Sequence, residues 1–315
     1  MSEWLLFLYA FLGVIVLVMA STTIYTIEQM MEKRSAKTEK DLRKKSIMKK
    51  GKGKRKVKQV SVAEAEPPPE EIKLEEEDTK SLEEILKEID AKLDKHQELQ
   101  RCLARLKKLR TKYPEDPQIL WRIGKNYQKL AEKEKDVPTK LINVEKGIEF
   151  CQRSLDMESK QADAHKWMAI LVGYKGQYQS TKEKIQCGKL FKKHLDIAIF
   201  LNPSDPVLQH MAGRFCLELA SLSWVERKIA KTIFSDPINC SVEIALDHFL
   251  QAEKLMGQED WKENRLLIAQ CYISKGEYKK ALEWLDKAKL AKDDSAGEPI
   301  DKEIEELLRK YSKYR

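Results

Sequence analysis

Glycine and proline are scarce in this chain, and the short motifs that mark many enzymes are absent. Twelve Gly and ten Pro in 315 residues are too few for a collagen-like or Gly/Ser-rich chain. No P-loop, G-x-G-x-x-G, H-E-x-x-H or G-x-S-x-G pattern occurs. Long runs rich in Lys, Glu, Leu and Ala favour helix over strand. The sequence therefore predicts an all-α protein that is not an enzyme and carries no cofactor.

Cysteine and histidine are too dispersed to suggest a metal site or a disulfide framework. No two cysteines form a C-x-x-C pair, and the helical histidines lack suitable partners three or four residues away. We expect reduced thiols in helix cores, structural or surface histidines, and no metal. The cysteines are Cys102, Cys151, Cys187, Cys216, Cys240 and Cys271.

Charge is missing from the 24 residues between Trp4 and Ile27. A helix of that length is roughly 36 Å long, enough for a bilayer core of about 30 Å. A cleaved signal peptide is the alternative, because Ala20 and Ser21 are small. Against a signal peptide, Glu3 is the one charged residue before the run, so the basic segment that begins a signal peptide is missing. The basic residues instead follow the run, as in a cytosolic flank. Residues 1–28 are therefore predicted to be a single-pass anchor, in the endoplasmic reticulum or the outer mitochondrial membrane, with the rest of the chain in the cytosol.

The next segment, residues 29–78, divides sharply by charge. Residues 31–60 hold 14 Lys or Arg against 3 Asp or Glu, whereas residues 61–90 hold 3 against 12. Three consecutive prolines at 67–69 oppose helix formation. We interpret 29–78 as a disordered linker, first basic and then acidic.

Ten cations within residues 43–58 form the densest basic cluster, and no aromatic residue accompanies them. Base stacking is therefore disfavoured, and we predict no nucleic-acid partner. Three interpretations remain: a solvated linker, a contact with anionic lipid, and a contact with an acidic polymer such as the glutamate-rich tails of microtubules. The cations are Arg43, Lys44, Lys45, Lys49, Lys50, Lys52, Lys54, Arg55, Lys56 and Lys58.

Residues 79–112 are predicted to form an amphipathic lead-in helix. Ser81 and Glu84 fit a capping box, and apolar residues follow at spacings of three and four. His96 and Gln100 then occupy the next positions of this apolar spacing, which favours packing on the next helices over a sustained coiled coil.

Residues 113–315 show a repeating pattern of paired helices typical of tetratricopeptide repeats. First helices are predicted around residues 120–127, 168–172, 212–216 and 267–271, and second helices around 147–155, 195–201, 245–252 and 278–288. Insertions are expected at 136–143, 173–182 and 224–239, the last as an extra helix or a capped loop. Residues 298–314 should form a terminal helix. Stacked pairs predict an α-solenoid with a concave groove for protein partners.

Within this domain, residues 165–252 carry elements that a plain tetratricopeptide repeat does not require, including a Gly-Arg pair and a Ser-Trp-x-Glu-Arg-Lys run. On these elements the chain resembles the regulator of microtubule dynamics protein family over roughly residues 100–312. The residues that carry the resemblance and form a candidate site are His165, Trp167, Gly213, Arg214, Trp224, Glu226 and Arg227.

These residues have two interpretations. In one, Arg214 and Glu226 pair across the third insertion while Trp167 and Trp224 fill it. In the other, the element from Gly213 to Lys228 lies at the rim of the groove and contacts a ligand or partner peptide.

The resemblance implies a non-enzymatic protein that associates with microtubules, and for some members an N-terminal anchor. It also implies that the helical domain of an anchored member holds phospholipid. The leading hypothesis is thus a cytosol-facing scaffold that links an organelle membrane to microtubules. The alternatives are a membrane contact-site protein that binds or transfers phospholipid, and a generic peptide-binding adaptor.

Overall fold

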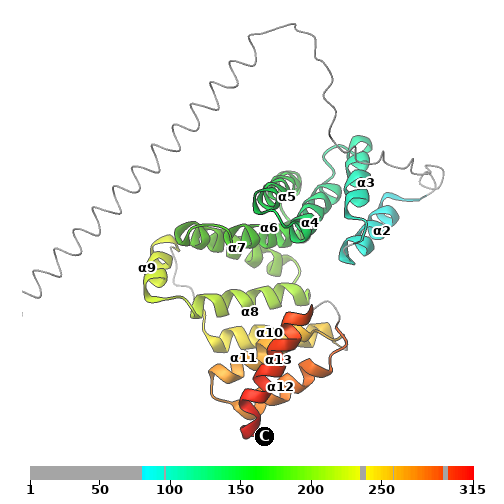
Figure 1. Ribbon diagram of the computed structural model, residues 1–315. Helices are drawn as coiled ribbons and strands as arrows, with labels where there is room; N and C mark the ends of the chain where they lie inside the picture. Colours follow the sequence, from blue (N-terminus) through cyan, green and yellow to red (C-terminus); the bar gives the residue numbers. More distant parts are fainter. Residues whose placement is uncertain (1–79, 96, 235–238, 258, 294–296) are drawn as a thin grey trace, which may run out of the picture. The chain divides into compact units, whose positions relative to one another are not determined.

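The computed structural model describes residues 80–95, 97–234, 239–257, 259–293 and 297–315, and every regular element in these ranges is helical (Figure 1). The predicted all-α class is therefore confirmed for these ranges. The elements are α2 (Leu82–Asp94), α3 (Leu99–Lys112), α4 (Pro117–Lys133), α5 (Val137–Met157), α6 (Ala162–Gly176), α7 (Thr181–Leu201), α8 (Pro206–Ala220), α9 (Trp224–Ile233), α10 (Val242–Met256), α11 (Lys262–Ser274), α12 (Tyr278–Leu290), α13 (Gly297–Tyr311) and the 3₁₀ turn η2 (Ser312–Tyr314).

The predicted anchor and linker lie outside the described residues, as do the ten cations of 43–58. Among the helices that are described, none is long and apolar enough to cross a bilayer. The membrane segment thus stays a prediction from the sequence.

Four helix pairs make up most of the described chain, and they are the pairs predicted from the repeat pattern. Helix α4 packs on α5, α6 on α7, α8 on α10, and α11 on α12 (Figure 1). Successive pairs meet through α5 with α6, α7 with α8, and α10 with α11. Helix α13 covers α12 and part of α11, as predicted for the terminal helix.

Aspartate caps start three of these helices. Asp116, Asp136 and Asp205 each accept backbone N–H bonds at the first turn of α4, α5 and α8. A proline occupies the first or second helical position in all three, where its missing N–H has no intrahelical partner to lose. The Asp-Pro spacing therefore fixes where each of these helices begins.

Two of the predicted insertions are helical. The segment 136–143 is the cap and first turns of α5, and 173–182 contains the end of α6 and the start of α7, with only 177–180 between them. Helices α5 and α7 are 21 residues long each, so the extra residues extend helices and leave the loops short. The third insertion does contain an extra helix, α9, which packs on α7.

The lead-in segment forms two helices, α2 and α3. The capping box of Ser81 and Glu84 is present at the start of α2. Helix α2 ends at Asp94 and α3 begins at Leu99, and Glu98 before α3 adopts a left-handed conformation with φ of 49°. Apolar residues of both helices join one buried cluster with α4, which explains why the apolar spacing does not continue as a coiled coil.

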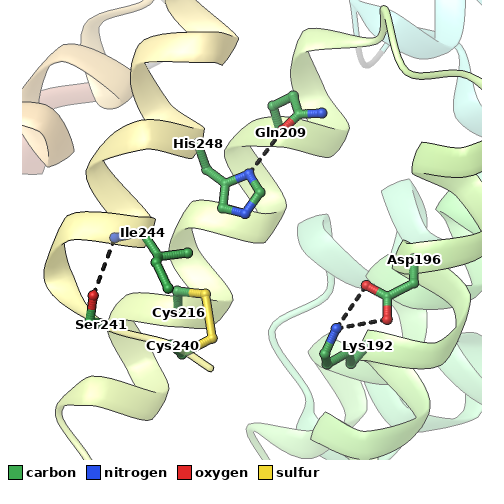
Figure 2. Close-up of a disulfide and its surroundings, with 8 residues drawn as sticks. All are labelled: Lys192, Asp196, Gln209, Cys216, Cys240, Ser241, Ile244 and His248. Atoms are coloured by element: carbon green, nitrogen blue, oxygen red, sulfur yellow. Dashed lines mark hydrogen bonds and ion pairs between the residues drawn. A yellow bond between two sulfur atoms is a disulfide. The ribbon is translucent and has the colours of Figure 1, made fainter. Parts of the chain in front are cut away.

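The expectation of reduced cysteines is wrong at one pair. Cys216 of α8 and Cys240, just before α10, form a disulfide (Figure 2). The packing of α8 on α10 brings the two Cα atoms to 4.8 Å although 24 residues separate them in sequence. His248 of α10 also donates from Nδ1 to Gln209 Oε1 of α8 at 2.9 Å (Figure 2). The other four cysteines are free thiols.

Candidate functional site

A cavity of about 410 Å³ opens among α6, α7 and α8, and residues in or next to α4, α9 and α11 complete its lining. That volume lies in the range of about 300–1,000 Å³ found for small-molecule sites. Phe191 of α7 and Phe215 of α8 stack at 5.6 Å between ring centroids on its wall. The apolar lining is Ile170, Ile185, Phe191, Met211, Phe215, Leu219, Leu222, Phe234 and Trp261.

Charged side chains of both signs border this cavity. The lining includes the carboxylates of Glu132, Glu218, Glu226 and Glu263 against the cations of Lys184 and Arg214. With His210 neutral, these side chains therefore give the border a net charge of −2. An apolar interior with a charged edge suits an amphipathic ligand better than a wholly polar one.

Arg214 pairs with a partner that the sequence did not indicate. Its Nη1 donates to Glu263 Oε1 of α11 at 2.7 Å. Glu226 instead closes a capping box with Ser223 at the start of α9, accepting from the Ser223 N–H at 2.9 Å and from its hydroxyl at 2.7 Å. The predicted Arg214–Glu226 pair is therefore wrong, although both residues border the cavity. The Ser223 hydrogen bonds also lower the pKa of Glu226.

Gly213 serves the packing of α8 on α10. A Cβ at this position would come within 2.6 Å of the Phe249 ring, which is completely buried. The Gly-Arg pair thus combines a close helix contact at Gly213 with a cavity-edge charge at Arg214.

The two tryptophans of the candidate site differ in their surroundings. Trp167 is half-buried and packs against the cluster that contains Met168, with Lys125 Nζ and Lys129 Nζ at 5.5 and 5.8 Å from its ring centroid. Trp224 is 70% exposed at the start of α9, so the prediction that it fills the insertion is wrong. Lys228 Nζ lies over the Trp224 ring, 3.9 Å from its centroid, in a cation–π contact.

A second hollow, of about 550 Å³, adjoins the cavity along α4, α6 and α8. The two share Gln128, Glu132 and Ile170 in their linings. The surface of the second hollow is polar and apolar in nearly equal parts, and Trp121 and Trp167 lie on its wall. Its charged residues are Arg122, Lys125, Lys129 and Lys166 with Asp90, Glu132 and Asp163.

Gln128 is a polar residue at the junction of the two hollows. It is 3% exposed, and its Nε2 donates to Glu132 Oε1 at 2.7 Å. Its Oε1 is buried with no hydrogen-bond partner among the described residues. A buried carbonyl oxygen of this kind is a ready acceptor for a ligand N–H or O–H.

The buried histidines are held in networks of hydrogen bonds. His165 Nε2 donates to the Ser159 carbonyl at 3.0 Å, so its Nδ1 accepts from His194 Nδ1 at 2.8 Å. Burial, the neighbouring His165 and Lys193 lower the pKa of His194 to about 4. His210 donates from Nδ1 to Asn264 Oδ1 at 3.0 Å and stacks on Trp261. Within the described ranges, no three His, Cys, Asp or Glu residues group as metal ligands.

The structure thus divides the seven residues of the candidate site. Arg214 and Glu226 border the cavity, and Trp167 borders the second hollow. His165 and Gly213 serve packing, Trp224 is exposed, and Arg227 donates to the Leu222 carbonyl at 2.9 Å. Glu263 and Gln128 were missed, because an isolated Glu or Gln on a helix has no distinguishing sequence signal.

Comparison with known proteins identifies the family. The family model described as regulator of microtubule dynamics protein 1-3 matches residues 85–312. The chain belongs to this family. The match includes all four helix pairs and the residues around the cavity.

Three curated relatives illustrate the similarity. Regulator of microtubule dynamics protein 2 of Rattus norvegicus is 34% identical over 179 residues, covering 57% of this chain and 43% of the relative. Protein 3 of Xenopus laevis is 35% identical over 200 residues, covering 62% and 42%. Protein 1 of Bos taurus is 34% identical over 215 residues, covering 66% and 67%. The chain thus spans somewhat over two fifths of the length of the first two.

A solved structure with a similar arrangement is that of a thermophilic TPR protein of Thermus thermophilus. It shares 15% identity with a TM-score of 0.48, and the match covers 67% of this chain and 91% of that one.

Proposed function

We propose that this protein is a membrane-anchored, non-catalytic scaffold that faces the cytosol and links an organelle membrane to microtubules. Family membership carries the proposal, since the relatives are named as regulators of microtubule dynamics. The uncharged window at 4–27 supplies a candidate anchor, and the ten cations of 43–58 supply a charge complement to acidic tubulin tails. The helical pairs supply surface for protein partners.

Co-sedimentation with microtubules tests this proposal. A chain of residues 29–315 should pellet with microtubules, and added salt should weaken the binding because exposed charges are screened within about 10 Å at 0.1 M. Replacing the ten cations of 43–58 by Gln should remove most of it. Equal pelleting of that variant would exclude the basic cluster from the mechanism, and no pelleting of the unaltered chain would contradict the proposal itself.

The apolar cavity favours a second candidate function, a contact-site protein that binds or transfers phospholipid. The cavity of about 410 Å³ has an apolar wall and a charged edge, which together suit an acyl chain with a polar head. Mass spectrometry of lipids that copurify with residues 73–315 tests this directly.

A pair of variants makes the lipid test specific. Leu219→Arg places a charge on the cavity wall and should abolish lipid recovery, whereas Leu290→Arg, at a position that is 80% exposed, should leave it unchanged. Equal lipid recovery from both variants, or none from the unaltered fragment, would contradict lipid binding in this cavity.

A further inference from the structure

Helix α9 exposes two large apolar side chains next to each other. Trp224 is 70% exposed and Val225 is 58% exposed, and they occupy its first two positions. The other exposed residues of α9 are Arg227, Lys228, Lys231 and Thr232, so within the span 224–233 no exposed residue is acidic. The outer face of α9, defined by Trp224, Val225, Arg227, Lys228 and Lys231, thus combines apolar surface with three positive charges.

The packing of the opposite side of α9 explains why the outer face points to solvent. Ala230 is buried, and Ile229 and Ile233 are half-buried against the protein. The capping box draws Glu226 to Ser223 at the N-terminus, and Lys189 Nζ of α7 donates to the Ile233 carbonyl at 2.8 Å at the C-terminus. Both ends are therefore fixed, and Trp224 and Val225 are not needed for packing the helix.

The chemistry of the outer face matches one kind of partner in particular. Tryptophan favours the interface between water and hydrocarbon, because its ring has an apolar body and a polar N–H. Interfacial helices place Lys and Arg beside such residues, where anionic headgroups attract them. An acidic protein tail would satisfy the three cations but would give Trp224 and Val225 no apolar surroundings.

We propose that the outer face of α9 docks on the surface of a bilayer that contains anionic lipid. The proposal rests on the membrane anchoring proposed above, which would keep a bilayer within reach of the helical domain. Trp224 and Val225 enter the headgroup region, and Arg227, Lys228 and Lys231 lie among the phosphates. Helix α9 contributes Glu226 to the cavity lining, and Leu222 and Phe234 on either side of it line the cavity as well. Docking would therefore place one wall of the cavity beside the bilayer.

Hydrogen exchange of the full chain with lipid vesicles tests the proposal. The chain is combined with vesicles of phosphatidylcholine alone, or with about 30% phosphatidylserine to give the negative surface. We expect amides of 224–233 to exchange at least about fivefold more slowly with the anionic vesicles. Equal exchange with both vesicle types would overturn the proposal.

Matched variants separate the contribution of each part of the face. Lys228→Glu with Lys231→Glu should remove the protection, whereas Lys310→Glu with Lys313→Glu, the same charge change at the same spacing on exposed residues of the C-terminal end, should not. Trp224→Ser should reduce the protection, and Phe200→Ser, at a position that is 85% exposed on α7, should leave it intact. Similar loss with the control variants would overturn the assignment to α9.

Two further outcomes keep this proposal distinct from the others. Resistance to alkaline extraction from membranes tests only the anchor. If the chain is extracted but the amides of α9 are still protected by anionic vesicles, the proposed anchor is contradicted and docking of α9 is supported. If the Lys228 and Lys231 variant loses microtubule binding while its exchange on anionic vesicles is unchanged, the face belongs to a protein partner and membrane docking is wrong.

Discussion

Arg214 on α8 reaches across to Glu263 on α11, and their side chains form an ion pair at 2.7 Å at the edge of the cavity. About half of the Arg214 side chain is exposed, so water screens the pair. Exposed pairs of this kind stabilise proteins by about 0–1 kcal/mol. The pair therefore orients charge at the cavity edge more than it stabilises the fold.

A double-mutant cycle tests which carboxylate Arg214 uses. Combining Arg214→Ala with Glu263→Gln should give a coupling energy of about 0.2–1 kcal/mol in urea unfolding, because the two side chains bond directly. Combining Arg214→Ala with Glu226→Gln should give a coupling near zero, because Glu226 is engaged by Ser223. The reverse order of the two couplings would contradict the described pairing.

Gly213→Ala should destabilise the protein, because the added methyl group would meet the Phe249 ring at 2.6 Å. Overpacking of this kind reduces the free energy of unfolding by about 1–3 kcal/mol. Gly188→Ala is the control, since a methyl group at that position would have an atom of Phe215, at 3.9 Å, as its nearest neighbour. That control should be neutral or stabilising by up to about 1 kcal/mol, since alanine favours helix over glycine. Equal melting temperatures for the two variants would refute the close contact at Gly213.

The repeat pattern was enough to predict the helix pairs, because the small and large apolar residues that mark them are the residues that pack. Met168 and Cys151, expected in the core, are indeed buried. The pattern could not predict helix lengths. Residues 136–143 were predicted as an insertion between helices, yet Asp136 caps α5 and Pro138 lies in its first turn, where proline is tolerated.

The candidate site was predicted less well than the fold. Sequence could place Arg214 and Glu226 near one region, but it could not tell which carboxylate Arg214 meets, since Glu263 is 49 residues away and belongs to another helix pair. One of the two interpretations placed Trp224 inside the third insertion, as expected for a residue that is highly buried on average. The capping box at Ser223 instead sets the start of α9 so that this ring faces outward.

The disulfide predicts a definite count of reactive thiols. The chain has six cysteines, of which Cys102, Cys151, Cys187 and Cys271 are free. Alkylation of the denatured, unreduced chain should therefore add four groups, and alkylation after reduction should add six. Because the bond closes a loop of 24 residues, Cys240→Ser should lower the stability of the oxidised protein by about 3 kcal/mol in the chain-entropy model.

The control for the disulfide is the same substitution under reducing conditions. With excess dithiothreitol, Cys240→Ser and the unaltered chain should unfold at nearly the same urea concentration, because neither then has a cross-link. Six alkyl groups on the unreduced chain would show that the two thiols are not joined.

Stability should fall as the pH is lowered from about 6.5 towards 4, because buried histidines resist protonation. Burial lowers the pKa of His194 to about 4, and it also lowers the pKa values of His165, His210 and His248. Between the folded and unfolded pKa values the unfolded chain binds more protons, so acid favours unfolding. Each histidine contributes a slope of up to about 1.4 kcal/mol per pH unit in that window.

His194→Asn isolates the contribution of the His165–His194 pair. The Asn side-chain amide can donate to His165 Nδ1 in place of the imidazole N–H but does not titrate, so stability at pH 7 should change little. The slope of the free energy of unfolding against pH between about 6.5 and 4.5 should decrease by up to about 1.4 kcal/mol per pH unit, which corresponds to one proton bound by the unfolded chain. Capped carboxylates such as Glu84 and Glu183, whose pKa values are lowered by hydrogen bonds from Ser81 and Ser180, begin to contribute in the lower part of this window, but they are present in both chains, so the difference between the two curves reports His194. Parallel stability curves for the variant and the unaltered chain would mean that His194 has the same pKa in the folded and the unfolded chain, which would contradict the lowered pKa of His194 in the fold.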